Sequence, residues 1–416
     1  MNEKKVIYIN LDGFSYSYFE MLRKNGGAQG FCELAREGIL FKNLRSGLVS
    51  ITNPMQSSIL SGAWSNKTHN FYQHYDPETR KVVKHYRTFD AENIAEVFIN
   101  NNKKAVAIHQ FMLENNPCRE GEFDRAYIKS GISRSTYTER FAILKKLVLK
   151  EPVKSGEVYF TYDEFPDFVA LYIDDLDSLG HNNDYDGYPK RRTPEERYAD
   201  IEKRLKGIQS EIVSFVDLCK TEGIYKQLLI LITTDHGMTP FFGKSKLPDL
   251  IREINALGIR ADTPYTVDNK TQIVALPYTI ECALYYQKSL LAEKEDMLTT
   301  LLNSLNYAER VFTKPQMISE FGFDERGPCF LLSPKYGMHF YHRDLDESYY
   351  GAGHDSFNET SQHIFGLLLG ENVLPSEYDE KVYAIDLLPG VLKHANGLKM
   401  KDATGRVFEN WFIKRP

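Results

Sequence analysis

The sequence predicts an α/β protein with a mostly parallel central sheet sandwiched by helices. Short apolar runs rich in Val, Ile, Leu, Phe and Tyr recur along the 416 residues, and they are near-continuous rather than alternating. Such runs are typical of strands buried on both faces, as in parallel sheets. Helical patterns separate the runs, and this alternation of strand and helix indicates the α/β class.

Five segments are predicted to be strands of this sheet: residues 6–11, 105–109, 168–173, 227–232 and 364–369. The clearest helix is predicted over residues 193–219. Pro194 suits its first turn, and Glu195 and Glu196 suit the positive end of its dipole. Apolar residues then recur at helical spacing, which predicts one buried side for this helix.

The segment from about residue 239 to 350 differs in character. It has short strand-like pieces and one helical piece near residues 293–305. A core strand is predicted after it, so the segment interrupts the main fold rather than following it. We therefore interpret residues 1–416 as a single α/β domain that carries residues 239–350 as an inserted cap.

Composition and charge limit the classes of function. Hydrophobic residues make up 42% of the chain and charged residues 26%, as in ordinary globular proteins with a large core. The net charge of -6 and the pI of about 6.0 argue against a nucleic-acid-binding surface, so no stable nucleic-acid complex is expected. A small phosphorylated substrate, such as a nucleotide, stays compatible because metals or local cations can bind it.

Targeting signals are not evident. The N-terminal apolar stretch has only the length of a strand and runs into Asp12, unlike a signal peptide. No stretch approaches the roughly 18–20 apolar residues of a membrane span. The five cysteines are scattered without a CxxC pair, which favours a reducing compartment. We expect a cytoplasmic protein without a membrane span, and we leave its oligomeric state open.

Acidic, histidine and threonine side chains lie where predicted strands end or helices begin. In open α/β sheets ligands bind beyond the carboxyl ends of the strands, so these side chains are expected to converge. Singly, each has an ordinary explanation as a helix cap, a turn residue or a structural histidine. Together they supply three carboxylates and three imidazoles, enough for two divalent cations. The residues are Asp12, Thr52, Asp177, His181, Asp235, His236 and His354.

The motifs around these residues resemble those of the alkaline phosphatase superfamily, in the branch of nucleotide pyrophosphatases/phosphodiesterases and phosphonoacetate hydrolases. They are IxxDGF at Asp12, TNP at Thr52, YIDDLDSLGH ending at His181, and TDHGM around His236. The resemblance implies an alkaline-phosphatase-like fold and two divalent cations, Zn²⁺ by preference and Mn²⁺ as the alternative. The implied ligands are Asp177, His181 and His354 for one cation, and Asp12, Asp235, His236 and the Thr52 oxygen for the other.

Thr52 is the predicted catalytic nucleophile. A threonine hydroxyl is a weak nucleophile at neutral pH, and coordination to a dication lowers its pKa. Attack on phosphorus would form a phospho-threonine that water then hydrolyses. We expect a metal-dependent hydrolase of phosphodiester or pyrophosphate bonds in nucleotide-type substrates. Phosphonoacetate-type carbon–phosphorus hydrolysis and phosphomonoester hydrolysis are alternatives, and a non-catalytic binding protein on the same fold is an alternative of another class.

The donors to the phosphate oxygens are harder to predict. The resembled families carry His-Gly and then Asn shortly after the nucleophile helix, whereas residues 68–70 here read THN. The candidate donors in this chain are the N–H of Asn53 and the side chains of Asn70 and Gln73. Substrate binding is therefore assigned to these three residues as a prediction.

An aromatic stretch over residues 69–86 contains Phe71, Tyr72, Tyr75 and Tyr86. It is interpreted as a wall on which a planar leaving group stacks, with Tyr72 and Tyr75 in contact with the substrate. The alternative interpretation is an edge hairpin with ordinary strand aromatics. The sequence leaves both open.

Overall fold

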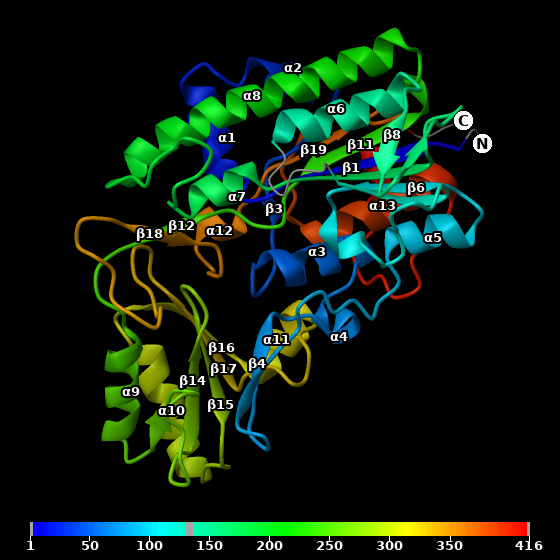
Figure 1. Ribbon diagram of the computed structural model, residues 1–416. Helices are drawn as coiled ribbons and strands as arrows, with labels where there is room; N and C mark the ends of the chain where they lie inside the picture. Colours follow the sequence, from blue (N-terminus) through cyan, green and yellow to red (C-terminus); the bar gives the residue numbers. More distant parts are fainter. Residues whose placement is uncertain (1–2, 130–135, 414–416) are drawn as a thin grey trace.

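The computed structural model of the protein describes residues 3–129 and 136–413, which form a larger and a smaller part (Figure 1). An eight-stranded sheet lies at the centre of the larger part, in the order β20-β2-β19-β11-β1-β10-β6-β7. The neighbouring strands from β11 to β7 are mutually parallel, as predicted. They are β1 (Lys5–Leu11), β6 (Ala105–Ile108), β7 (Arg125–Ile128), β10 (Phe168–Ile173) and β11 (Leu228–Thr233).

The last predicted strand departs from the parallel arrangement. β19 (Gly366–Leu369) lies antiparallel to β11 and also to β2 (Gly38–Phe41) on its other side. β20 (Ser376–Tyr378) then pairs with β2 in parallel. An uninterrupted apolar run reflects burial of both faces of a strand and not its direction, so the sequence could not predict this reversal.

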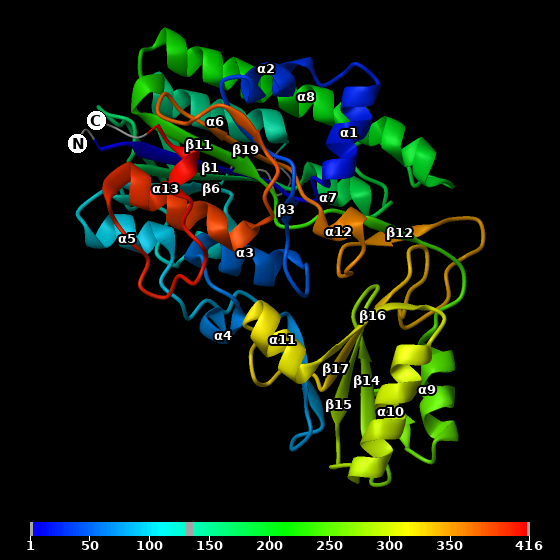
Figure 2. The same cartoon turned by 180° about the vertical axis from the view of Figure 1, so that it is seen from behind.

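Helices cover both faces of this sheet, and alternate residues of β1 point into the two layers. Ile7 and Ile9 join one apolar cluster, and Val6 and Tyr8 join the other. Figures 1 and 2 show the two layers on opposite sides of the sheet. One layer contains α1 (Tyr16–Lys24), α2 (Gln29–Ala35), α6 (Tyr137–Val148) and α8 (Pro194–Thr221). The other contains α3 (Thr52–Ser61), α5 (Ile94–Asn100) and α13 (Leu387–Asn396).

The sequence predicted the start of α8 correctly. Thr193 caps the helix, Glu196 completes the capping box, and Pro194 occupies the first turn. Its buried side includes Ile201 and Ile208, which pack on the sheet. Within the described ranges, no helix combines the length and the apolar character needed to cross a membrane.

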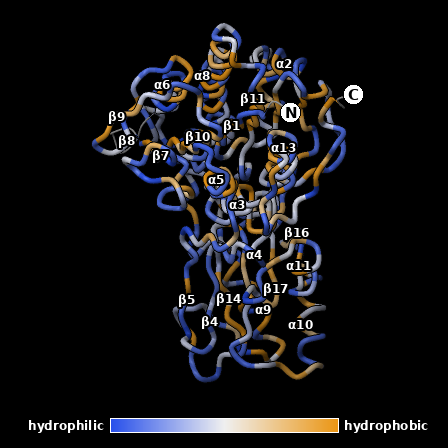
Figure 3. The backbone as a smooth tube through the Cα atoms, turned by 90° about the vertical axis from the view of Figure 1, so that its right-hand side faces the viewer, coloured by the Kyte–Doolittle hydropathy of each residue, from blue (hydrophilic) through white to orange (hydrophobic). Residues whose placement is uncertain are grey.

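A second sheet forms the smaller part, in the order β13-β14-β15-β17-β16. Its strands are β13 (Ala261–Asp262), β14 (Ile273–Pro277), β15 (Cys282–Tyr286), β16 (Ala308–Thr313) and β17 (Phe330–Pro334). An apolar cluster joins this sheet to α9 (Leu247–Ala256) and α10 (Ala292–Ser304). Figure 3 shows the second sheet below the larger part, near the hairpin of β4 (Gln73–Asp76) and β5 (Lys81–Lys84).

The chain enters and leaves the smaller part through two paired strands. β12 (Thr239–Phe241) and β18 (Gly351–Gly353) are antiparallel, with Thr239 opposite Gly353. The second sheet thus falls between residues 239 and 350, and the interpretation of this segment as a cap on a single catalytic domain stays a prediction. Shorter elements complete the chain: β3 (Leu44–Arg45), α4 (Ser65–Thr68), β8 (Val153–Ser155), β9 (Val158–Phe160), α7 (Asp175–Gly180), α11 (Lys314–Phe321), α12 (Glu359–Gln362) and β21 (Val382–Tyr383).

Replacing Thr193 by Ala removes the side-chain cap of α8, and we expect the free energy of unfolding to fall by about 1 kcal/mol. The reason is that Thr193 Oγ1 accepts a hydrogen bond from the N–H of Glu196, which alanine cannot do. Urea unfolding followed by circular dichroism measures the change. Thr300→Ala, at an exposed position inside α10, is the matched control and should not lower stability. Equal losses in both variants would contradict the role of the cap.

Candidate metal centre and nucleophile

The predicted site residues converge at the carboxyl ends of the parallel strands. Asp12 directly follows β1, Asp235 and His236 follow β11 closely, and Asp177 lies in α7 just after β10. His354 follows β18, where the chain returns from the smaller part. The six acidic and histidine residues form two groups whose ligand atoms lie within 4.8 Å of one another: Asp177, His181 and His354, and Asp12, Asp235 and His236.

In the first group Asp177 and His181 are half-buried and His354 is buried. Asp177 and His181 are four residues apart at the end of α7, which places both on one side of the helix. Asp177 Oδ1 lies 3.2 Å from His181 Nε2 and 3.7 Å from His354 Nε2. Burial alone would raise the pKa of Asp177, but the neighbouring imidazoles lower it below its usual range. In turn Asp177 outweighs the effect of burial and raises the pKa of His181 to about 9.

The second group is buried. His236 Nε2 lies 3.2 Å from Asp12 Oδ1 and 3.6 Å from Asp235 Oδ2. Burial, followed by the charges of Asp235 and Asp177, raises the pKa of Asp12 well above its usual value. The hydroxyl of Tyr172 donates a hydrogen bond to the other oxygen, Asp12 Oδ2. The group therefore concentrates negative charge with little compensation from the protein.

The three imidazoles are oriented by the backbone. Nδ1 lies 2.9 Å from the Ala352 carbonyl oxygen in His181, 3.0 Å from that of Gly237 in His236 and 2.7 Å from that of Ser50 in His354. An Nδ1–H that donates to each carbonyl leaves the lone pair of Nε2 directed at the carboxylates. Metal-binding histidines are typically held in this way, with the second ring nitrogen hydrogen-bonded.

The donor set fits divalent cations. Asp12 Oδ1, Asp177 Oδ1 and Asp235 Oδ2 are buried and have no hydrogen-bond partner among the described residues. These are the same oxygens that face the Nε2 atoms. A buried carboxylate oxygen without a partner is costly, and a cation between the oxygen and the ring nitrogen would remove the cost. Histidine nitrogen and aspartate oxygen are both ligands that zinc accepts.

Thr52 lies beside the second group. Its Oγ1 is 3.0 Å from His236 Nε2, and it is the first residue of α3. The N-cap of α3 is Ile51, which makes no side-chain cap, so the Thr52 hydroxyl does not serve as the helix cap. The ordinary explanation of this threonine, as an N-cap, therefore does not apply.

Two glycines permit the close packing around the ligands. Gly13 has φ +79°, and a Cβ there would lie 2.8 Å from the Cα and N of Asp177. A Cβ at Gly237 would lie 2.0 Å from the Thr360 carbonyl oxygen. Sequence reasoning identified these glycines only as parts of motifs. Glycine directly after a strand-end aspartate or histidine is the signal that could have indicated a close backbone approach.

Sequence reasoning also missed the partners of the ligands. Tyr172, which holds Asp12, is the fifth residue of β10 and looks like an ordinary strand aromatic. Ser50 holds His354, because its carbonyl accepts from Nδ1 and its hydroxyl donates to the His354 carbonyl at 2.5 Å. Its only sequence signal is its position two residues before Thr52. Such contacts join segments distant in sequence, and no local pattern predicts them.

The predicted phosphate donors have different surroundings. Asn53 is half-buried, and its Oδ1 accepts from the N–H of Arg87 at 3.2 Å. Asn70 is fully buried, and its amide is occupied, because Nδ2 donates to the Thr88 carbonyl and Oδ1 accepts from the N–H of Tyr72. The side chain of Gln73 makes no hydrogen bond to any described residue, although Gln73 is only 7% exposed. Of the two side-chain amides, that of Gln73 is therefore the available one.

The aromatic stretch forms a hairpin, β4 and β5, rather than one continuous wall. Phe71 and Tyr75 are buried in a cluster shared with the second sheet. Tyr75 donates a hydrogen bond from its hydroxyl to Gln287 and packs against Tyr285. Tyr72 is half-buried with its ring against Tyr278. The contacts of Tyr75 thus tie the hairpin to the second sheet, and its role in substrate binding stays a prediction without a supporting contact.

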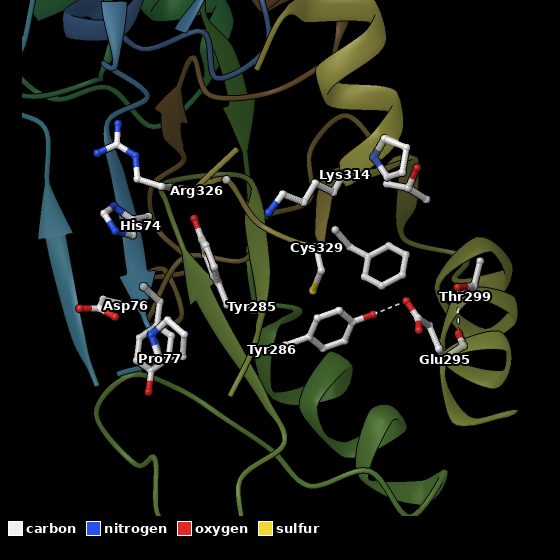
Figure 4. Close-up of a pocket in the computed structure, with 15 residues that line it drawn as sticks. His74, Asp76, Pro77, Tyr285, Tyr286, Glu295, Thr299, Lys314, Arg326 and Cys329 are labelled. Atoms are coloured by element: carbon white, nitrogen blue, oxygen red, sulfur yellow. Dashed lines mark hydrogen bonds between the residues drawn. The ribbon is translucent and has the colours of Figure 1, made fainter. Parts of the chain in front are cut away.

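A cavity of about 760 Å³ lies between this hairpin and the second sheet (Figure 4). Tyr75, Tyr285 and Tyr286 line it together with Lys314 from the start of α11. None of the residues of the two groups lines this cavity, and neither does Thr52. The cavity is therefore separate from the candidate metal centre.

The family model of type I phosphodiesterase/nucleotide pyrophosphatase matches residues 6–358, which include both groups and Thr52. The chain belongs to this family. As a type I phosphodiesterase/nucleotide pyrophosphatase family protein it is a hydrolase, and the predicted resemblance is confirmed. Members of this family typically bind two metal ions, for which the two groups are the candidate sites.

The curated relatives of this chain have low sequence identity to it. Bis(5'-adenosyl)-triphosphatase ENPP4 of Bos taurus is 21% identical over 287 residues, which cover 68% of this chain and 57% of that protein. The Homo sapiens protein of the same name is 22% identical over 238 residues, which cover 56% and 48%. The chain thus spans about half the length of the curated relatives it matches.

Solved structures resemble this chain over nearly its whole length. Murine ectonucleotide pyrophosphatase/phosphodiesterase 5, an inactive variant in complex with AMP, has a TM-score of 0.67 at 15% identity, with 97% of both chains covered. The human protein has a TM-score of 0.65 at 16% identity, also with 97% of both chains covered. At this identity the likeness shows the shared fold alone.

Gly13→Ala is expected to displace Asp177 and weaken metal binding, because the new Cβ meets the Asp177 backbone at 2.8 Å. Gly26→Ala is the matched control: Gly26 has a similar φ of +72°, but a Cβ there meets nothing within 4 Å. Both variants carry backbone strain of about 1–2 kcal/mol, and only Gly13→Ala should lower the affinity for Zn²⁺ in calorimetric titration. Equal Zn²⁺ affinities in the two variants would contradict the packing argument.

Proposed function

We propose that the protein hydrolyses phosphodiester or pyrophosphate bonds in nucleotide-type substrates, with Thr52 as nucleophile and divalent cations, Zn²⁺ in preference to Mn²⁺, at the two groups. One observation carries this proposal: Thr52 Oγ1 lies 3.0 Å from His236 Nε2, beside the buried carboxylates. The AMP bound to the murine neighbour and the name of the curated relatives support a nucleotide-type substrate.

The start of α3 positions the proposed nucleophile and can also bind a phosphate group. The first N–H groups of a helix have no acceptor within it, so they attract a phosphate oxygen to the position of Thr52. Bound divalent cations would lower the pKa of the Thr52 hydroxyl and offset the charge that develops on the phosphoryl oxygens. Thr52 Oγ1 then attacks phosphorus, the bond to the leaving oxygen breaks, and phospho-threonine forms. Water hydrolyses this intermediate and restores the hydroxyl.

Gln73 is the side-chain donor that we propose for a phosphate oxygen, together with the N–H of Asn53. The amide of Gln73 has no hydrogen-bond partner among the described residues, whereas the Asn70 amide is occupied at both ends. The Gln73 carbonyl accepts from Tyr278 at 3.3 Å, which ties the start of β4 to the second sheet. The half-buried ring of Tyr72 beside it offers a surface for the remainder of the substrate.

Thr52→Ala should lower the turnover of bis(p-nitrophenyl) phosphate and thymidine p-nitrophenyl phosphate by on the order of 10³-fold or more, because the nucleophile is lost. Thr52→Ser keeps a hydroxyl and should keep measurable turnover. Thr300→Ala, at an exposed position, should keep the wild-type rate. A wild-type rate in Thr52→Ala would reject the nucleophile. If the wild type turned over phosphonoacetate faster than the two diesters, the reaction would be assigned to a carbon–phosphorus bond. Faster turnover of p-nitrophenyl phosphate would assign it to a phosphomonoester.

Removal of divalent cations with a chelator should abolish turnover, and Zn²⁺ should restore it better than Mn²⁺. The metal-bound protein should also be more stable, because a free metal concentration of 100 times Kd raises the free energy of unfolding by about 2.7 kcal/mol. Elemental analysis should find two ions per wild-type chain and fewer in Asp235→Ala. Asp217→Ala, at an exposed position of α8, is the control and should keep both ions. Full turnover in a metal-free protein would reject this part of the proposal.

A further inference from the structure

The loop that carries His354 is held on both sides. On one side Ser50 binds it twice, through its carbonyl at His354 Nδ1 and through its hydroxyl at the His354 carbonyl. Ser50 belongs to the segment that leads into Thr52, so this contact fixes His354 to the nucleophile. On the other side the loop meets the smaller part.

The contact with the smaller part is made by the next residue, Asp355. Its side chain is fully buried, and Oδ2 accepts hydrogen bonds from three consecutive backbone N–H groups. The donors are Thr279 and Ile280 at 2.8 Å and Glu281 at 3.1 Å. Successive N–H groups that converge in this way form an anion-binding concavity. These three residues belong to the turn between β14 and β15, so the Asp355 carboxylate next to His354 lies at this end of the second sheet.

Further contacts surround this carboxylate. A Cβ at Gly353, the residue before His354, would lie 3.0 Å from the Thr279 side chain, so the turn packs closely on the loop. Beyond Asp355, the N–H of Phe357 donates to Ser333 Oγ in β17 at 2.6 Å. The second sheet therefore touches the chain before and after His354. Asp355 makes three hydrogen bonds to this turn through one carboxylate oxygen.

We infer that Asp355 is a positioning residue for His354, and that through it the turn between β14 and β15 is a structural part of the metal centre. This inference rests on the proposed function, because it assumes that His354 binds a metal ion. Three hydrogen bonds from backbone donors hold the Asp355 side chain, and the adjacent peptide links it to His354. Without them the imidazole keeps its bond to Ser50 but loses the restraint on the far side of the loop.

The test is metal binding by the full chain, in Asp355→Ala and Asp355→Asn. Asp355→Ala removes the acceptor, whereas Asp355→Asn keeps a neutral oxygen that still accepts and is expected to fold if the alanine variant does not. Asp386→Ala is the matched control. Asp386 is also a buried aspartate that accepts backbone N–H bonds, from Tyr383 and Arg406, but in the part of the chain around α13.

Calorimetric titration of metal-free protein with Zn²⁺ should show two binding events in the wild type. In Asp355→Ala one event should weaken by about 10–100-fold, as for other residues that orient metal ligands. Asp355→Asn should lie between. The visible spectrum of the Co²⁺-loaded protein should change in the Asp355 variants and not in Asp386→Ala. Asp386→Ala should lower the stability of the metal-free protein while it keeps both affinities.

The outcomes separate the two proposals. Two unchanged binding events in both Asp355 variants would overturn the positioning role and leave the proposed function intact. An equal loss of Zn²⁺ affinity in Asp386→Ala would also overturn it, since the effect would then be general destabilisation. If the wild type binds no Zn²⁺, Co²⁺ or Mn²⁺, the proposed function itself fails, and the positioning role falls with it.

Discussion

Buried negative charge is the constraint on which the rest of this structure depends. Asp12, Asp177 and Asp235 each have a buried oxygen without a hydrogen-bond partner among the described residues. In the part of the chain that the structure describes, no lysine or arginine pairs with any of the three, and only imidazoles lie within ion-pair distance. Charges removed from water are costly unless they are paired. The folded chain therefore lacks positive charge at this place, and divalent cations are the partners that its donor atoms fit.

The scaffold meets this constraint by fixing imidazoles rather than by adding cationic side chains. The three histidines direct Nε2 at the carboxylates because backbone carbonyls hold their Nδ1 atoms. The candidate ligands lie just beyond the ends of β1, β10, β11 and β18, so only the folded sheet brings them together. Gly13 and Gly237 let these segments approach without a side chain between them. Much of the local packing thus serves to hold repelling groups at short range.

The ligands were predictable because each follows a strand whose burial is visible in the sequence. Parallel neighbours such as β1 and β11 end on one edge, so Asp12, Asp235 and His236 had to meet there. The direction of β19 was not predictable, since burial carries no information on direction. Nor were the partners of Asn70 and Tyr75. Both side chains look available after the nucleophile helix, and only the fold shows that Thr88 and Gln287 occupy them. Local patterns predict which hydrogen-bonding groups a side chain has, but they do not predict which distant residue forms a hydrogen bond with them.

The position of the smaller part follows from the same constraint. His236 lies just before the segment that forms the second sheet, and His354 lies just after it. Their rings stack with centroids 3.6 Å apart, so the two ends of this long segment meet inside the candidate metal centre. Closing such a loop costs conformational entropy, and the pairing of β12 with β18 helps to hold the ends together. A segment inserted between two adjacent ligands cannot move freely without moving one of them. The hydrogen bonds between Asp355 and the turn of β14 and β15 add a further restraint, so the second sheet helps to hold the loop that carries His354.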